Sequence, residues 1–434
     1  MKWLGSGIAC IGLVVFSAAC DNSPKVIDPF PIVVNLSSGP VLLKAQEGDG
    51  EVLDIVVDVL SPITILDHFR PGDAPRDPKR HLVELTLWGA TETPIPRFRF
   101  PQTTAYDLHT CAPSEALCMA GQDESTHNVY GVLGTDILSR SSVRFSFTSQ
   151  QLRFFPDAAG SDSERTLSCD AVFSSPFVGG GTLRIAGSEV RFGGWRPTLG
   201  ACIHTETISE PAATQSERGT DLHMAISTAF GATLLTEDAY ERYSASGIAP
   251  SFETLPTSTV YLPSGPIQGR RAEIPFLALT GNAGGDSDGR GPCRELYANA
   301  RMRNAKSCSD DTVDCPCAGS ADTCKAAAAV ELSHSVSVLV VPANLSLLQT
   351  LRDELRPQRP ELDGILGVQA LRSLEIEFDY PNNRLLMRCE DLATCITRPQ
   401  VRSQSTLPAL DTCRELEQGK RDSQQVRPDA GVIP

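Results

Sequence analysis

The chain has few positive charges relative to negative ones and no long apolar run, and these two absences exclude some partners and some membrane topologies. Its 434 residues include 38 Lys and Arg against 53 Asp and Glu, which gives a formal net charge of −15. No basic patch stands out, so a nucleic acid is excluded as an expected partner. The apolar run from Ile8 to Ala19 is too short to span a bilayer as a helix.

Signature motifs of several enzyme classes are also missing. The sequence has no Gly-x-Ser-x-Gly elbow of a serine hydrolase, no His-Glu-x-x-His zinc motif and no glycine loop that would hold a phosphate. We therefore predict neither a Ser-His-Asp hydrolase nor any cofactor. Sustained helical periodicity is scarce, while 31 Pro and 34 Gly favour strands and turns.

The N-terminus is typical of an export signal. One Lys precedes the apolar run, and small residues precede Cys20 in "SAAC". This box resembles that of bacterial lipoproteins, in which the Cys is lipidated, although the family's usual Leu is Ser17 here. Cleavage after Ala19 without lipidation is the alternative. We predict a signal peptide over 1–19 and a lipidated tether over 20–28, anchored to a membrane of the bacterial cell envelope.

The cysteine count favours lipidation. Of 14 cysteines, Cys10 would leave with the signal and Cys20 would carry lipid, so 12 remain, an even number that suits disulfides in an oxidising compartment. Cys111 and Cys118 are expected to close a small loop, and Cys169 and Cys202 are plausible partners. The other candidates are Cys293, Cys308, Cys315, Cys317 and Cys324, in an insertion at about 282–328, and Cys389, Cys395 and Cys413, which would pair in part with that cluster. No Cys-x-x-Cys spacing is repeated, so disulfides are predicted there and a metal is not.

Two halves of the chain repeat one order of elements. The first contains "VLDIVVDVLSPITIL" and later "VYGVLGTDILSRSSVRFSFTSQQLRFF"; the second contains "DLHMAISTAFGATLL" and later "LDGILGVQALRSLEIEFDYPNNRLLM". Each half predicts a strand, a bend, a strand, a Gly-apolar-Leu-Gly element, a short helix and a hairpin. We expect lobes over 29–156 and 171–398, a linker over 157–170 and a polar tail over 399–434. Helices are expected at 236–243, capped by Thr236, and at 343–356.

These elements resemble the pepsin-like and retropepsin-like aspartic peptidases. In that family each lobe carries an Asp-Thr-Gly bend, and a later apolar-apolar-Gly element threads through it. The first bend falls on Asp58, Val59, Leu60 and Ser61, and the second on Ser227, Thr228, Ala229 and Phe230. The threading elements fall on Gly131 to Gly134 and on Gly364 to Gly367. The resemblance implies an all-β, two-lobed fold with few short helices.

Departures from the family pattern fall on the chemistry. An aspartic peptidase shares one proton between two carboxylates, but Ser227 stands at the second carboxylate position and cannot supply that acid. Val59 lacks the hydroxyl of the family's Thr, and Leu60 replaces a Gly. The family's larger members carry a Tyr near the tip of a flap hairpin; the corresponding stretch has none, and Trp88 is expected beside a plain hairpin turn. Because its partner is missing, Asp58 is interpreted as a structural residue that caps its loop rather than as a catalytic remnant.

The sequence therefore predicts a catalytically inactive, exported member of this fold, monomeric, that binds a peptide or protein ligand between its lobes by strand addition. One alternative is an active aspartic endopeptidase that uses Asp58 with an unrecognised second acid. Another is a purely structural envelope protein.

Overall fold

The structure is a computed structural model. It describes residues 30–31, 33–34, 40–66, 79–88, 94–107, 129–155, 171–174, 181–185, 188–192, 196–204, 219–245, 249–262, 265–280, 293, 327–332, 334–355, 361–382, 384–390 and 393–399. The predicted signal peptide, the tether up to residue 28, the linker over 157–170 and the tail from residue 400 lie outside these residues. So do Cys20, Cys111, Cys118, Cys169, Cys308, Cys315, Cys317, Cys324 and Cys413.

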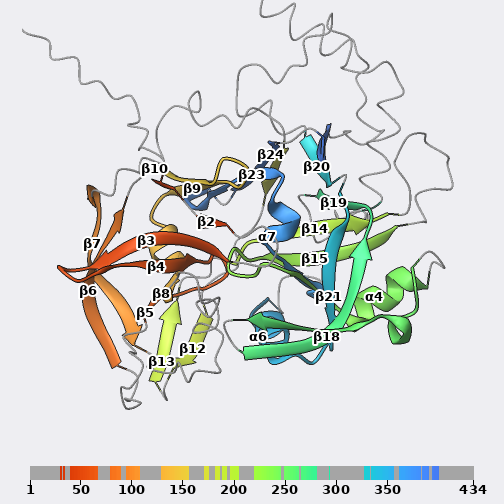
Figure 1. Ribbon diagram of the computed structural model, residues 1–434, viewed down its shortest axis with the longest axis horizontal. Helices are drawn as coiled ribbons and strands as arrows, with labels where there is room; N and C mark the ends of the chain where they lie inside the picture. Colours follow the sequence, from red (N-terminus) through yellow and green to blue (C-terminus); the bar gives the residue numbers. More distant parts are fainter. Residues whose placement is uncertain are drawn as a thin grey trace, which may run out of the picture.

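The first half forms a seven-stranded sheet (Figure 1). Its strands are β2 (Val33–Val34), β3 (Val41–Glu47), β4 (Val52–Val57), β5 (Ile65–Leu66), β6 (Lys79–Trp88), β7 (Pro94–Asp107) and β8 (Val129–Leu133). They pair in the order β2-β3-β4-β8-β5-β7-β6, and β3 also pairs with β6. Most neighbours are antiparallel, whereas β4 with β8 and β5 with β7 are parallel.

The second half builds a larger sheet of ten strands around the same arrangement. Its strands are β14 (Thr198–Ile203), β15 (Thr220–Ile226), β16 (Thr233–Thr236), β17 (Thr257–Leu262), β18 (Gly265–Ile274), β19 (Leu277–Thr280), β20 (Ala327–Leu332), β21 (Val336–Val341), β22 (Gly364–Leu366) and β25 (Cys395–Pro399). Strand β22 lies between β15 and β16, parallel to the first and antiparallel to the second. In the first half β8 lies between β4 and β5 in the same way.

A six-stranded sheet contains strands of both halves. It consists of β1 (Phe30–Pro31), β10 (Gln151–Phe155), β9 (Ser142–Ser146), β23 (Leu374–Asp379), β24 (Arg384–Cys389) and β11 (Ala171–Ser174), in that order. Strand β9 of the first half pairs with β23 of the second. The remaining strands, β12 (Gly181–Ile185) and β13 (Ser188–Phe192), form a hairpin. In Figure 1 the six-stranded sheet lies above the point where the two lobes meet.

Helices are short and few among the described residues. They are α2 (Thr135–Leu138), α4 (Glu237–Ser244), α6 (Ser346–Leu355) and α7 (Val368–Leu371), with 3-10 turns at Phe252–Thr254 and Tyr380–Asn382. The hydroxyl of Thr236 accepts a hydrogen bond of 3.3 Å from the backbone N–H of Ala239, which is the N-cap contact that the sequence predicts.

The core explains why the apolar runs became strands. Alternate residues of β9 and β23 point to one side, where Phe145 and Phe378 are fully buried, as is Phe147 directly after β9. Phe145 packs edge-on against Phe378 with the ring centroids 5.7 Å apart. One apolar cluster runs from the first half through this sheet into the second. The predicted all-β, two-lobed fold class is confirmed, while the sequence patterns do not predict strands β1, β3, β11, β14, β17, β18, β19, β20 and β25.

Candidate functional site

The first bend follows strand β4 and holds Asp58 by local hydrogen bonds. The backbone N–H of Asp58 donates to the carbonyl of Leu133 on β8, at 3.1 Å. The carboxylate accepts the N–H of Leu60, at 3.0 Å from Oδ1. An Asp that accepts the N–H two residues ahead stabilises its own turn. The capping role expected for Asp58 thus has a bond to support it.

The second bend follows β15 and repeats this geometry with a different side chain. The N–H of Ser227 donates to the carbonyl of Leu366 on β22, at 3.0 Å. The Ser227 hydroxyl oxygen accepts the N–H of Ala229, at 3.1 Å. Serine therefore preserves the turn-stabilising acceptor that an aspartate would provide, and it does so without an ionisable acid.

The two bends meet at Asp58 and Ser227. The Ser227 hydroxyl donates to Asp58 Oδ1 across 2.8 Å, a bond between residues 169 positions apart. Asp58 is 8% exposed and Ser227 is fully buried. The structure thus brings together the two positions that the sequence aligned, as one carboxylate bonded to one hydroxyl.

Thr228 links the backbones of the two bends. Its hydroxyl donates to the carbonyl of Val57, at 2.6 Å, and accepts the N–H of Val59, at 3.2 Å. Its own carbonyl accepts the N–H of Val41, at 2.8 Å. Val59 has no hydroxyl to return this contact, so the side-chain link between the bends runs in one direction only.

The threading elements are packed against the bends through glycines. A methyl group added at Gly131 would overlap the carbonyl oxygen of Ile65, and one at Gly364 would overlap that of Leu234. Because the β8 and β22 backbones approach β5 and β16 so closely, only glycine fits at these two positions.

The next glycine of each threading element occupies an equivalent place. The N–H of Gly134 donates to the hydroxyl of Thr64, at 3.1 Å, and that of Gly367 donates to Thr233, at 3.2 Å. Each element then continues into a short helix, α2 or α7.

Ser61 and Phe230 complete the correspondence between the bends. The carbonyl of Ser61 accepts the N–H of Thr135, at 2.8 Å, and the carbonyl of Phe230 accepts the N–H of Val368, at 2.7 Å. Each bond ties a bend to the first residue of the helix that follows its threading element. The hydrogen bonds therefore repeat through both halves, whereas the side chains at the centre differ.

Arg196 is a member of this site that the sequence did not reveal. It is 5% exposed, and its guanidinium donates to the carbonyl of Leu60 in the first bend. Its positive charge also acts on the Asp58 carboxylate. A single Arg between Trp195 and Pro197 carries no motif, so only the approach of the two halves exposes its role.

The electrostatics at the centre combine burial with compensation. Burial raises the pKa of the Asp58 carboxyl above its ordinary value, although the Leu60 N–H, the Ser227 hydroxyl and the Arg196 charge act in the opposite direction. Burial and the nearby Asp58 charge raise the pKa of Tyr380 well above its ordinary value. Among the described residues, none of the groups that act on Asp58 brings a second carboxylate.

Two disulfides lie within the described residues, and one of them corrects a pairing expected from sequence. Cys202 bonds Cys293 rather than Cys169. Cys202 on β14 lies opposite Asp221 at the N-terminal end of β15, and the N–H of Cys293 donates to the Asp221 carboxylate at 2.6 Å, so the two cysteines lie side by side. Cys389 bonds Cys395, with the two Cα atoms 5.5 Å apart, which is compatible with the expectation that Cys389, Cys395 and Cys413 pair only in part with the insertion.

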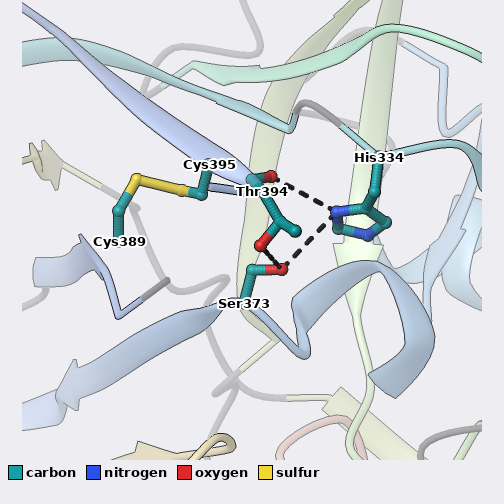
Figure 2. The surroundings of a disulfide bond; sticks show 5 residues. All are labelled: His334, Ser373, Cys389, Thr394 and Cys395. Atoms are coloured by element: carbon teal, nitrogen blue, oxygen red, sulfur yellow. Dashed lines mark hydrogen bonds between the residues drawn. A yellow bond between two sulfur atoms is a disulfide. The ribbon is translucent and has the colours of Figure 1, made fainter. Parts of the chain in front are cut away.

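Figure 2 shows a small polar cluster beside the second disulfide. Thr394 donates from its hydroxyl to the Ser373 hydroxyl, at 2.9 Å. His334 Nδ1 lies 3.3 Å from the Thr394 carbonyl and 3.5 Å from the Ser373 hydroxyl. These contacts hold the loop closed by Cys389 and Cys395 against the start of β23.

The described part of the chain contains no group of three or more His, Cys, Asp or Glu residues arranged to hold a metal ion. Within the same residues, no helix is long and apolar enough to cross a membrane.

Comparisons with known proteins find likeness in structure and none in sequence. No family model and no curated protein matches this chain. The solved structures similar to it include an aspartic proteinase from Irpex lacteus, at 14% identity and a TM-score of 0.39, covering 84% of this chain and 99% of that one. Basic 7S globulin from soybean is similar at 10% identity and a TM-score of 0.39, covering 84% and 95%.

Proposed function

We propose that the protein is an exported lipoprotein whose aspartic-peptidase-like fold binds a peptide or protein segment without cleaving it. One observation carries the proposal: the Asp58 carboxylate is bonded, at 2.8 Å, to the hydroxyl of Ser227. Aspartic peptidase chemistry requires one carboxylate to act as base toward water while a second donates a proton to the carbonyl. A serine hydroxyl does not ionise at ordinary pH, so Asp58 and Ser227 share no acidic proton.

The position of Ser227 supports the same conclusion. Ser227 is fully buried and its hydroxyl is bonded to Asp58, so the group at the second carboxylate position has no acidic proton to donate. The retained bends, threading glycines and Thr228 link support a role that needs the shape of the fold and not its chemistry. Among the described residues, the groups that act on Asp58 include no second carboxylate, which disfavours the alternative of an active endopeptidase.

The test is cleavage of a mixed peptide library between pH 3 and pH 7 by the wild-type protein, with Asp58→Asn as the matched control. We expect no cleavage by either protein and retention of a subset of peptides by the wild type. Pepstatin-sensitive cleavage that is lost in Asp58→Asn would establish the active alternative. A protein that neither cleaves nor retains peptides would instead be a structural component of the envelope.

Ser227→Asp alone is not expected to create an enzyme. The Arg196 charge beside the first bend favours the ionised form of a carboxylate pair, and Val59 still lacks the hydroxyl that would brace it. Activity is expected to require Ser227→Asp together with Val59→Thr, Leu60→Gly and Ala229→Gly, and to rise further when Arg196→Gln is added.

Anchoring at Cys20 is a separate part of the proposal. The small-residue box and the 12 cysteines that remain after Cys10 and Cys20 are removed support it. Mass spectrometry of the mature N-terminus should find an acylated Cys20, and Cys20→Ala should release the protein from membranes. An unmodified N-terminus with full release of the wild type would contradict the lipid anchor and leave the binding proposal intact.

A further inference from the structure

The two halves of the chain pair along β9 and β23, and one side of this seam is charged and buried. Arg144 faces Glu377 in the register, Ser142 faces Asp379, and Ser146 faces Glu375. All six residues are at most 7% exposed. The opposite side of the same strands carries the aromatic core described above, so the polar row is a separate feature of the seam.

The central pair makes close contacts. Arg144 donates from Nε and from Nη2 to one oxygen of Glu377, at 2.9 and 2.6 Å. Its Nη1 lies 3.9 Å from Glu375, and its guanidinium stacks 4.7 Å from the Phe155 ring centroid. The Ser142 hydroxyl donates to Asp379, at 2.9 Å. Each contact joins the first half to the second, except that with Phe155.

The central pair lies on the axis that relates the two halves. Arg144 and Glu377 are 233 residues apart, and Gly131 and Gly364 are separated equally, since 364 minus 131 is 233. The equivalent of Arg144 in the second half is therefore Glu377, which is also its partner in the register. If the halves were identical, this place would bring together two identical side chains.

Pairing between identical halves would accordingly be unfavourable. Two β9 strands in this register would place one Arg144 against another. Two β23 strands would place Glu377 against Glu377, and Glu375 against Asp379 twice, which gives six carboxylates, whereas the two β24 strands would bring four Arg residues, Arg384 and Arg388 of each copy, in register with Asp379 and Glu375. Like charges buried in a seam of this kind cannot be relieved by water.

We infer that the buried Arg144–Glu377 pair makes this seam heterotypic, so that each half accepts the other half of the chain and rejects the same half of a second copy. The partner of β9 is a strand with acidic residues at alternate positions, and the partner of β23 has a cation at its centre. Charge decides which halves pair, because the apolar side of the seam has Phe145 in one half and Phe378 at the equivalent position of the other. The apolar side therefore discriminates little between the two halves.

The test uses charge reversal in the full chain and measures the equilibrium constant of unfolding in urea. Arg144→Glu and Glu377→Arg should each raise that constant by about 10²- to 10³-fold, because each buries two like charges. The double variant Arg144→Glu/Glu377→Arg should recover at least tenfold relative to either single variant. If the charge-reversed variants do not fold, three neutral variants are compared instead: Arg144→Gln, Glu377→Gln and the double variant. The double neutral variant should be at least as stable as each single variant.

The choice of partner is measured by mixing. When Arg144→Glu and Glu377→Arg proteins are refolded together at about 50 μM, the new carboxylate of one can meet the new cation of the other. Within one chain, each half meets its tethered partner at a local concentration of roughly 1 mM. This tether favours pairing within the chain by about 20-fold over pairing between chains at about 50 μM, and the like-charge penalty is larger than that. Light scattering should therefore find a 1:1 dimer, whereas the wild-type protein alone should remain a monomer.

Lys44 and Asp54 supply the control pair. They bond at 2.8 Å across β3 and β4 within one half, with Lys44 half-exposed. Lys44→Glu should change the unfolding constant less than about fivefold, and its mixture with Asp54→Lys should not dimerise. Single reversals at the seam as mild as this control, strictly additive double variants, or a seam mixture that stays monomeric would each overturn the inference.

Discussion

Thr228→Val should cost about 2–6 kcal/mol of unfolding free energy, because it removes the hydroxyl that joins the two bends while keeping the side-chain volume. The variant leaves the N–H of Val59 and the carbonyl of Val57 without this partner, and Thr228 is fully buried. A buried donor or acceptor left unsatisfied costs about 1–3 kcal/mol, and two such groups are affected. No cavity term is added, since valine has the shape of threonine.

Thr350→Val is the matched control for this measurement. Its hydroxyl donates to the Ser346 carbonyl, at 2.9 Å, on the exposed side of α6, where water replaces the lost bond. Urea unfolding at constant pH should give a loss below about 0.5 kcal/mol for the control. A Thr228→Val protein that lost less than 1 kcal/mol would refute the view that this hydroxyl links the halves.

Three further outcomes are expected. Because burial raises the Asp58 pKa, the folded state binds the carboxyl proton more tightly than the unfolded state. Asp58 therefore lowers the free energy of unfolding as the pH rises from about 4 through the raised pKa. Asp58→Asn should flatten this fall in urea titrations, and an unchanged pH profile would contradict the prediction. Gly364→Ala should destabilise by more than 3 kcal/mol, because its methyl group would overlap the Leu234 carbonyl; near-native stability would contradict the close approach. Replacing Cys389 and Cys395 together by Ala should cost about 2 kcal/mol, the value for a loop of about seven residues, as calorimetry can check.

Many of the strands and both threading elements could be predicted from sequence, because they depend on local patterns of apolar residues and glycines. Alternating apolar residues identified β4, β9, β15 and β23, and the double occurrence of Gly-apolar-Leu-Gly identified the elements that thread the bends. The two bends, 169 residues apart, align without gaps, so residue order alone identifies Ser227 as the counterpart of Asp58. The polar strands β17 and β18 escaped notice because their pattern, interrupted by Pro and Gly, reads as loop.

Which distant residues meet depends on how the two halves pack. The fold class, the two halves and the absence of the second carboxylate can be predicted from residue patterns, because each depends on residue type at a given spacing. The presence of Arg196 at the first bend, the pairing of Cys202 with Cys293, and the meeting of Arg144 with Glu377 on the axis all arise when the halves pack. Such contacts depend on the relative placement of strands far apart in the chain, and residue patterns within a single strand do not encode that placement.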